Sequence, residues 1–213
     1  MKVAEIWRYP VKSMAGERLG RARLEPLGLE GDRVVHVEDA RGRVVTARTH
    51  PRLLGHRGTL SDRGEPLVDG APWDQAEANR SVTDIVGPGA RLVRDDTADR
   101  FDVLPLLVAT DGAIAAFGHD GRRLRPNLVI GDVAGLAERS WSGHFLRIRD
   151  VVIGIQDLRS RCVMTTFDPD TQEHDPGILR AIVQQFGGKL SLNGYVIQPG
   201  DIGTGDPVEL VRP

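Results

Sequence analysis

The sequence predicts an α+β protein that is mainly β with a few helices. Short apolar or β-branched runs recur along the chain, and glycine-containing turns separate most of them. Only one stretch, residues 176–186, shows a strong helical spacing of apolar side chains. Many short strands with regular turns are typical of β-barrels and sandwiches. The length of 213 residues suits one large domain or two small ones.

The first third of the chain predicts short strands joined by tight turns. The first strand alternates loosely and stops at Tyr9-Pro10. Gly28 and Gly31 predict a tight turn before the next strand, and the run from Asp39 to Gly42 predicts a hairpin. The expected strands and extended pieces lie at residues 3–7, 24–26, 34–38, 44–47, 59–60 and 67–68.

A polar stretch from Asp69 to Arg80 suggests a boundary between two parts of the chain. We expect residues 1–75 to form one lobe and residues 76–213 to form the second domain. β-Branched and other apolar residues predict further strands beyond this boundary. These expected strands lie at residues 81–86, 91–93, 104–108, 128–130, 145–148, 151–155, 194–197, 200–203 and 207–211.

Two helices are expected in the second part. Residues 111–117 are small and rich in alanine, and either Thr110 or Asp111 can cap their first turn. Residues 176–186 carry one apolar stripe, with Asp175 as the capping residue, a proline in the first turn and two glycines after the last turn.

Composition narrows the classes of partner and compartment. The formal net charge is −2, so no global field attracts the chain to nucleic acid or to an anionic membrane. A single cysteine excludes an internal disulfide and a self-contained iron–sulfur cluster. Charges interrupt the first residues, and no run approaches the ~20 apolar residues of a membrane span. We expect a cytoplasmic protein that binds neither nucleic acid nor a membrane.

The single cysteine, Cys162, lies in the stretch from Ser160 to Thr171. Arg161 comes directly before it, and two hydroxyls, a carboxylate and a proline follow. A cysteine acts as a nucleophile or metal ligand as the thiolate, which a neighbouring cation stabilises. The alternative is a free cysteine packed as a small apolar side chain, and composition alone favours that alternative.

Three cationic motifs lie at the ends of expected strands. They are Lys12-Ser13, Asp32-Arg33 and the run from Arg122 to Asn127, which ends in Arg125-Pro126-Asn127. Guanidinium forks and amides give bidentate hydrogen bonds, so together these motifs can hold a phosphate and a heteroaromatic ring. Each motif alone is better explained as solvated charge in a loop. No phosphate-binding loop or dinucleotide fingerprint occurs, because the glycine pair at residues 28 and 31 leads into a strand.

Taken together, these motifs resemble those of the MOSC family. The motifs that carry the resemblance are Tyr9-Pro10-Val11-Lys12-Ser13, Gly31-Asp32-Arg33, Arg125-Pro126-Asn127 and the run from Arg161 to Thr171. The branches concerned are the C-terminal domain of molybdenum cofactor sulfurase and the amidoxime-reducing molybdoenzymes. The resemblance covers essentially the whole chain. It implies a MOSC β-barrel packed against an N-terminal β-barrel-like lobe.

The resemblance also implies a molybdenum cofactor, in its molybdopterin form, held between the lobes. Cys162 would be the protein ligand of the metal, because a soft thiolate suits a metal that already has sulfur donors. The residues implied to contact the pterin or its phosphate, or to flank the ligand, are Lys12, Ser13, Arg33, Arg125, Asn127, Ser160 and Arg161. The residues implied to shape the ligand loop are Thr165, Thr166 and Asp168. Relatives carry a serine-containing cofactor segment at the place of residues 111–117, where Thr110 and backbone amides are expected to substitute.

The implied function is a molybdenum-dependent oxidoreductase that reduces N-hydroxylated small molecules. Electrons would come from a separate redox protein, such as a ferredoxin, a flavodoxin or a cytochrome b5-like protein with its reductase. Two alternatives remain open. In one, a persulfide on Cys162 delivers sulfur to a metal cofactor. In the other, the protein is a non-catalytic carrier of the cofactor.

Overall fold

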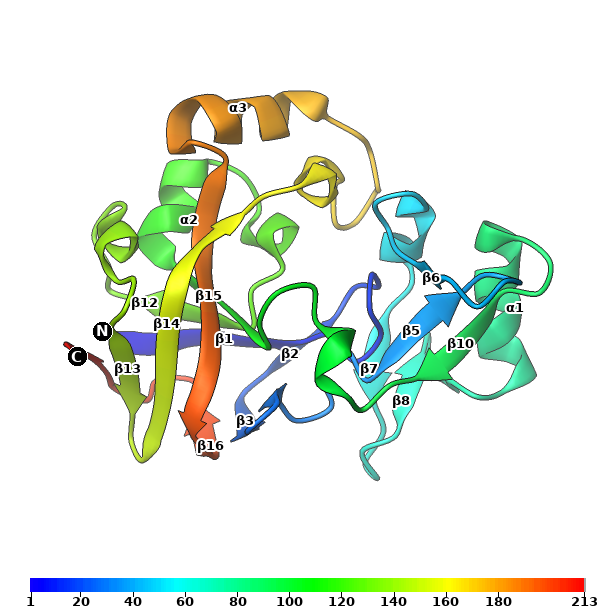
Figure 1. The fold of residues 1–213 in the computed structure, drawn as a ribbon, viewed down its shortest axis with the longest axis horizontal. Coiled ribbons are helices and arrows are strands. Elements are labelled where there is room, and N and C mark those ends of the chain that lie inside the picture. The colour runs from blue at the N-terminus through cyan, green and yellow to red at the C-terminus, as the bar shows by residue number, and fades with distance from the viewer. Residues whose placement is uncertain (213) are drawn as a thin grey trace.

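The computed structural model describes residues 1–212, which form two β-rich regions lying side by side (Figure 1). The strands are β1 (Lys2–Arg8), β2 (Glu17–Leu19), β3 (Arg21–Glu25), β4 (Gly28–Leu29), β5 (Val35–Glu38), β6 (Val44–Val45), β7 (Gly58–Leu60), β8 (Pro66–Val68), β9 (Ala71–Pro72), β10 (Arg91–Arg94), β11 (Leu106–Thr110), β12 (Leu128–Gly131), β13 (Phe145–Ile148), β14 (Val151–Ser160), β15 (Lys189–Gln198), β16 (Gly200–Gly203) and β17 (Val208–Val211). The helices are α1 (Ala76–Val86), α2 (Asp111–Phe117) and α3 (Pro176–Phe186), with short 3-10 helices η1 (Pro51–Gly55), η2 (Ala98–Arg100), η3 (Gly121–Leu124), η4 (Ala137–Ser140) and η5 (Val163–Thr166). The prediction of a mainly β, α+β protein is confirmed.

The larger region is built on a sheet of eight strands in the order β17-β13-β14-β15-β11-β12-β1-β2. Its pairs are antiparallel, with β11 and β12 as the parallel exception. The start of β1 also pairs with the residues before β17, through a bridge between Lys2 and Pro207. The amide of Val3 donates to the carbonyl of Asp206 at 2.9 Å beside this bridge. The row of strands therefore closes on itself, as a barrel requires.

The core of the larger region fills the inside of this closed sheet. Val3 and Ile6 of β1 are buried, and every residue of the central strand β12 is buried as well. The small sheet β16-β3-β4 adds Leu24 and Ile202 to the same core. Each Å² of apolar surface that is removed from water contributes about 25 cal/mol, and this burial is the main stabilising contribution to such a core.

The smaller region has its own core between two small sheets. Their strand orders are β10-β5-β6 and β7-β8-β9. Val35 and Val37 of β5 are fully buried in this core, together with Leu53 of η1. Helix α1 packs against it through Ala78 and Val82.

The expected strand at residues 81–86 is wrong, because these residues form the second half of α1. Taken alone, residues 81–86 are rich in β-branched side chains, which favour a strand. Over the longer window, Ala78, Val82 and Val86 repeat at a spacing of four and place one face of a helix on the core. Gly87 ends the helix with a φ of 118°.

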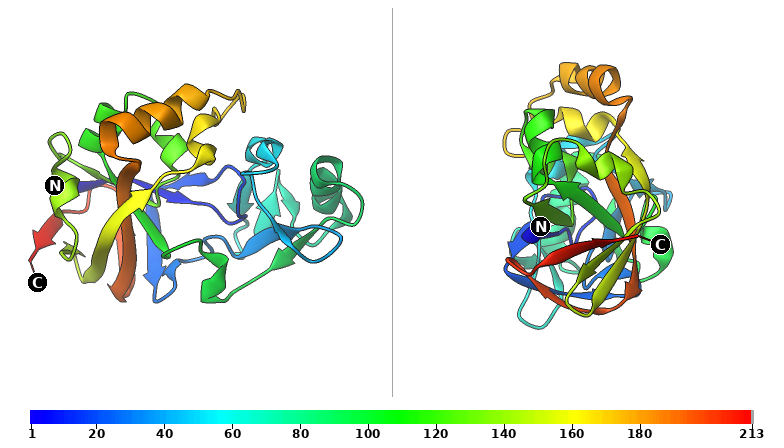
Figure 2. Two further views of the ribbon diagram at one scale, coloured as in Figure 1. Left: turned by 45° about the horizontal axis from the view of Figure 1, so that its top comes forward. Right: turned by 90° about the vertical axis from the view of Figure 1, so that its left-hand side faces the viewer.

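Helices α2 and α3 lie together beside the large sheet, away from α1 (Figure 2). They enclose a third apolar cluster, to which α2 gives Phe117 and α3 gives Ile182. The predicted ends of α3 are confirmed, because Asp175 accepts a hydrogen bond from the amide of Gly177 at 2.8 Å and Gly187 is left-handed.

The chain passes between the two regions more than once. Strands β1 and β2 belong to the large sheet, whereas α1 and β10 pack on the smaller core. A division at residue 75 stays a prediction. Among residues 1–212, no helix has the length and apolar character to cross a membrane.

Candidate functional site

A cavity of about 460 Å³ lies where the two regions meet. Its walls come from the residues after β1, the turn before β5, the end of η3 and the end of β14. Of the residues singled out in the sequence, those that line it are Lys12, Ser13, Arg33, Arg125, Asn127, Ser160, Arg161 and Cys162. The fold thus brings together four motifs that are far apart in the chain.

The lining of this cavity is strongly cationic. It contains one lysine and six arginines but only two carboxylates, Asp102 and Asp157. Arg48 and Arg159 were not singled out in the sequence, and Arg123 was noted only as part of the cationic run from Arg122 to Asn127. Clustered cations next to low-dielectric walls attract anions and raise their local concentration. The arrangement therefore favours a ligand with several negative charges.

Three residues of the cavity wall have a left-handed backbone although none is glycine. The φ angles are 71° at Ser13, 56° at Arg33 and 55° at Arg125. Such a conformation is uncommon for residues with a Cβ atom, costs energy, and is often found at functional sites. At each of these positions the chain turns sharply beside the cavity.

Two buried polar side chains, those of Asp32 and Asn127, contact Arg33 and hold it in place. Asp32 is fully buried, accepts a hydrogen bond from the amide of Tyr9 at 2.7 Å and forms an ion pair with Arg33. Asn127 is also fully buried, and its Oδ1 accepts from Arg33 at 3.3 Å and from the amide of Leu107 at 3.1 Å. Asn127 therefore holds Arg33 in place, in addition to lining the cavity.

Two guanidinium groups of the wall lack full hydrogen bonding within residues 1–212. Arg161 donates from Nη2 to the carbonyl of Leu124 at 2.8 Å, but its buried Nε has no partner there. Arg125 lies over the ring of Tyr9 at 4.3 Å, and its side chain has no hydrogen bond or ion pair to the described residues. Burial lowers the pKa of each arginine to about 10, so both remain charged at neutral pH. Incompletely paired, partly desolvated cations favour an anionic ligand.

The thiol of Cys162 is half-buried at the point where β14 gives way to η5. The main-chain carbonyl of this residue accepts hydrogen bonds from Thr165, at 3.1 Å from the amide and 2.9 Å from the hydroxyl. Arg48, from the smaller region, lines the same cavity as the thiol. Burial lowers the pKa of Arg48, but its interactions with Asp102 and Cys162 outweigh burial and raise that pKa overall. The thiol therefore shares the cavity with this cation.

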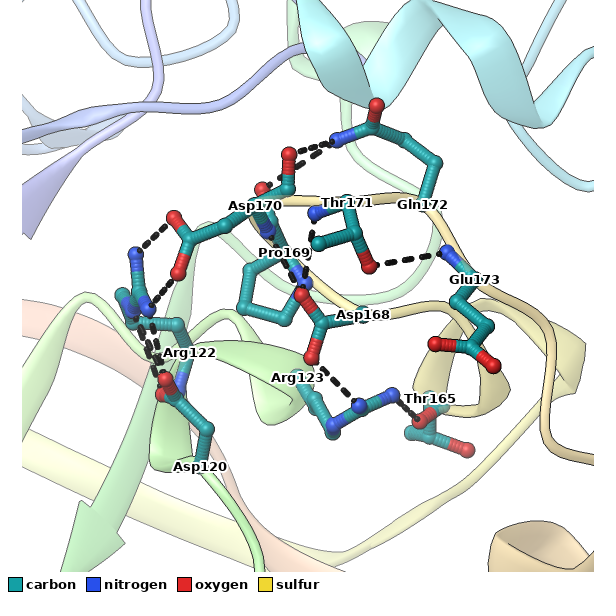
Figure 3. Close-up of polar contacts among 10 residues, drawn as sticks. All are labelled: Asp120, Arg122, Arg123, Thr165, Asp168, Pro169, Asp170, Thr171, Gln172 and Glu173. Carbon is teal, nitrogen blue, oxygen red and sulfur yellow. Dashed lines mark hydrogen bonds and ion pairs between the residues drawn. The ribbon is translucent and has the colours of Figure 1, made fainter.

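Two predicted residues act outside the cavity wall. Asp168 binds Arg123 at 2.8 Å and accepts from the amides of Asp170 and Thr171 at 3.0 Å (Figure 3). It thus reaches the cavity only through Arg123. Thr165 is fully buried and contacts Cys162 as described above.

Thr110 is not brought into the cavity. It is fully buried at the end of β11, and its hydroxyl accepts the hydrogen bond from the amide of Ala113 that caps α2. The expectation that Thr110 replaces a cofactor-binding serine is not supported by this placement. The helix cap accounts for the hydroxyl.

Among residues 1–212, no group of three or more histidine, cysteine or acidic side chains is arranged to hold a metal ion. A metal at this cavity would have one candidate thiolate ligand from the chain, Cys162, with its other donors supplied by a bound group.

Comparison with known proteins gives two matching family models, "MOSC N-terminal beta barrel domain" over residues 1–98 and "MOSC domain" over residues 113–209. Mitochondrial amidoxime-reducing component 1 of Homo sapiens is 27% identical, over 98% of this chain and 82% of that protein. Mitochondrial amidoxime reducing component 2 of Homo sapiens is 25% identical, over 79% and 67%. Molybdenum cofactor sulfurase of Bombyx mori is 34% identical, over 41% of this chain and 10% of that protein. The solved YUAD protein from Bacillus subtilis shares the fold, with a TM-score of 0.56 at 13% identity over 100% and 96% of the two chains.

Proposed function

The chain belongs to the MOSC family, and we propose that it is a molybdenum-cofactor-dependent reductase of N-hydroxylated compounds. The observation that carries the proposal is the cavity itself, which places one thiol among seven cations. The relatives named for amidoxime reduction support the reaction class.

The donor set of the cavity fits a molybdopterin-type group. Such a group presents a phosphate, which needs cations, and a metal with sulfur donors, which accepts a further thiolate. The incompletely paired guanidinium groups of Arg125 and Arg161 are available to an anion. Cys162 lines the same cavity. Lys12, Ser13 and Arg33 would hold the phosphate, and Cys162 would be the metal ligand.

The residues of the chain would bind and orient the cofactor and limit its access to water. When bound, the cofactor supplies the two-electron reduction, in which an N-hydroxy compound takes up two electrons and two protons, its N–O bond breaks, and the N–H compound and water are formed. Thr165 fixes the main chain at Cys162 through the two hydrogen bonds described above. Asn127 fixes Arg33. These contacts hold the thiol and the cations in place before any ligand arrives.

The two electrons that each reduction consumes would have to come from an external donor. We propose a separate redox protein for this role, of the ferredoxin, flavodoxin or cytochrome b5-like class. The reduced thiol that the site requires is compatible with a reducing compartment such as the cytoplasm.

The proposal is tested with protein produced in a host that makes the cofactor. Molybdenum content and benzamidoxime reduction by dithionite-reduced methyl viologen are measured for the wild type and for Cys162→Ser. We expect turnover by the wild type and its loss in the variant. Molybdenum-loaded wild type that does not reduce benzamidoxime with any donor would contradict the reductase and favour a carrier. A stable persulfide on metal-free Cys162, detected by mass spectrometry without reductase activity, would favour the sulfur-carrier role.

A further inference from the structure

A second cavity, of about 270 Å³, lies directly behind the wall of the first. The two cavities share Arg123, Arg125 and Met164. The second one also uses η1 and the residue Arg57 of the smaller region, together with the segment after η5. It therefore lies at the same junction of the two regions but does not include the thiol.

The second cavity is apolar and aromatic along much of its lining. Trp7, Leu54, Met164 and Phe167 all contribute to it. Leu54 and Phe167 are buried members of the smaller core, so this wall is rigid. Aromatic rings and a thioether form favourable contacts with an aromatic ligand.

Two of the four arginines around this cavity are already neutralised. Arg122 forms a bidentate pair with Asp170, at 2.8 and 2.6 Å, and also binds Asp120 at 2.7 Å (Figure 3). Arg123 points the other way in the same view and pairs with Asp168 at 2.8 Å. The only carboxylate in the lining, Asp170, is thus engaged by Arg122.

The other two arginines of this cavity, Arg57 and Arg125, lack such partners. Neither Arg57 nor Arg125 has a side-chain hydrogen bond or ion pair to any residue in the described part of the chain. Arg57 is exposed at the cavity, and Arg125 forms part of the wall over the ring of Tyr9. A cavity with an apolar body and unpaired guanidinium groups matches a ligand with an apolar body and one anionic group.

We propose that the second cavity binds a small aromatic carboxylate. Its ring contacts Trp7, Met164 and Phe167, and its carboxylate pairs with Arg57 and Arg125. Met164 follows Cys162 by two residues, so an occupant touches the segment that carries the thiol. The two cavities share Arg125, but the ligand needs no cofactor, so its binding can be measured separately from the proposed reductase activity.

The test is calorimetric titration of the cofactor-free, full-length protein with benzoate and with its neutral analogue benzamide. Benzoate should bind roughly tenfold more tightly, because only the carboxylate gains the charge-assisted hydrogen bonds. Arg57→Gln should remove most of this preference. Arg63→Gln is the matched control, because Arg63 is also exposed and lines neither cavity.

A further variant locates the bound benzoate. Lys12 lines only the larger cavity, so Lys12→Gln should leave benzoate binding unchanged. Circular dichroism spectra that match the wild type establish that the variants are folded. Equal affinities for benzoate and benzamide would overturn the proposal. So would no detectable binding of benzoate, or benzoate binding that is lost in Lys12→Gln and kept in Arg57→Gln.

Discussion

The Nζ atom of Lys12 lies 2.8 Å from Oδ1 of Asp102 in the larger cavity. The same carboxylate forms an ion pair with Arg48 and lies 3.9 Å from Arg159. Burial raises the pKa of Asp102, but the hydrogen bond from Lys12 and the charges of the three cations outweigh burial and lower it. Asp102 is therefore ionised at neutral pH and acts as an internal counterion for cations that an anionic ligand would also contact.

Removing this counterion should strengthen anion binding. We expect Asp102→Asn to bind inorganic phosphate about fivefold more tightly than the wild type, because one repulsive charge near the ligand is worth about 1 kcal/mol. Calorimetry on cofactor-free protein measures the change. Asp99→Asn, which alters an exposed carboxylate outside the cavity, should have no effect. Weaker phosphate binding by Asp102→Asn would mean that the carboxylate is needed to position Lys12.

The left-handed backbone of Ser13 gives a prediction about stability. Its φ of 71° is easily adopted by glycine and strongly disfavoured for a β-branched residue. Ser13→Gly should lie within about 1 kcal/mol of the wild type, because relief of strain offsets the greater entropy of the unfolded chain. Ser13→Val should lose about 2 kcal/mol. Urea unfolding measures both free energies, and equal stabilities of the two variants would show that the backbone here is not a constraint.

The parts of the fold that the sequence predicts well have local causes. The helix at residues 176–186 has a capping aspartate, an apolar stripe and two terminal glycines, and all of these act within a few residues. The helix α1 lacks a side-chain cap hydrogen bond, and its apolar face is evident only when Ala78 is taken together with Val82. Closure of the large sheet depends on contacts between residues about 200 apart, such as Lys2 and Pro207, which no local pattern shows.

The residues of the site also divide into those that local sequence motifs predict and those that only the tertiary structure brings together. The motifs around Lys12, Arg33, Arg125 and Cys162 are compact, and the fold brings all of them to one cavity. Arg48 and Asp102 come from loops without a motif, and only the tertiary structure places them there. Arg159 could have been found, because it lies two residues before Arg161 and side chains at that spacing share one face of an extended strand.

A buried acid in the larger region predicts a dependence of stability on pH. Glu138 is fully buried; its Oε1 accepts from the amide of Ser191 at 3.1 Å, while its Oε2 has no partner within residues 1–212. Burial raises the pKa of Glu138 above its usual value of 4.5. The folded state therefore holds this proton more tightly than the unfolded state. Its contribution to stability is complete below pH 4.5 and is lost as pH rises through the higher folded pKa.

Glu138→Gln keeps the side chain neutral at every pH. We expect the variant to be more stable than the wild type at pH 8, by on the order of 1 kcal/mol, because the amide never ionises in the buried site whereas the carboxyl of Glu138 must do so at that pH. The difference should shrink towards pH 4. Urea unfolding at both pH values measures it, with the exposed Glu173→Gln as the control. A gain in stability that is the same at pH 4 and pH 8 would contradict the assigned role of ionisation.

The assignment of Cys162 as the metal ligand is tested most directly by X-ray absorption at the molybdenum edge. The sample is protein from a host that makes the cofactor, with the wild type compared to Cys162→Ser at measured molybdenum content. We predict that the wild type contains molybdenum and that the variant has one sulfur neighbour fewer at the metal, or has lost the metal. A variant with the same molybdenum content and the same number of sulfur neighbours as the wild type would contradict the assignment.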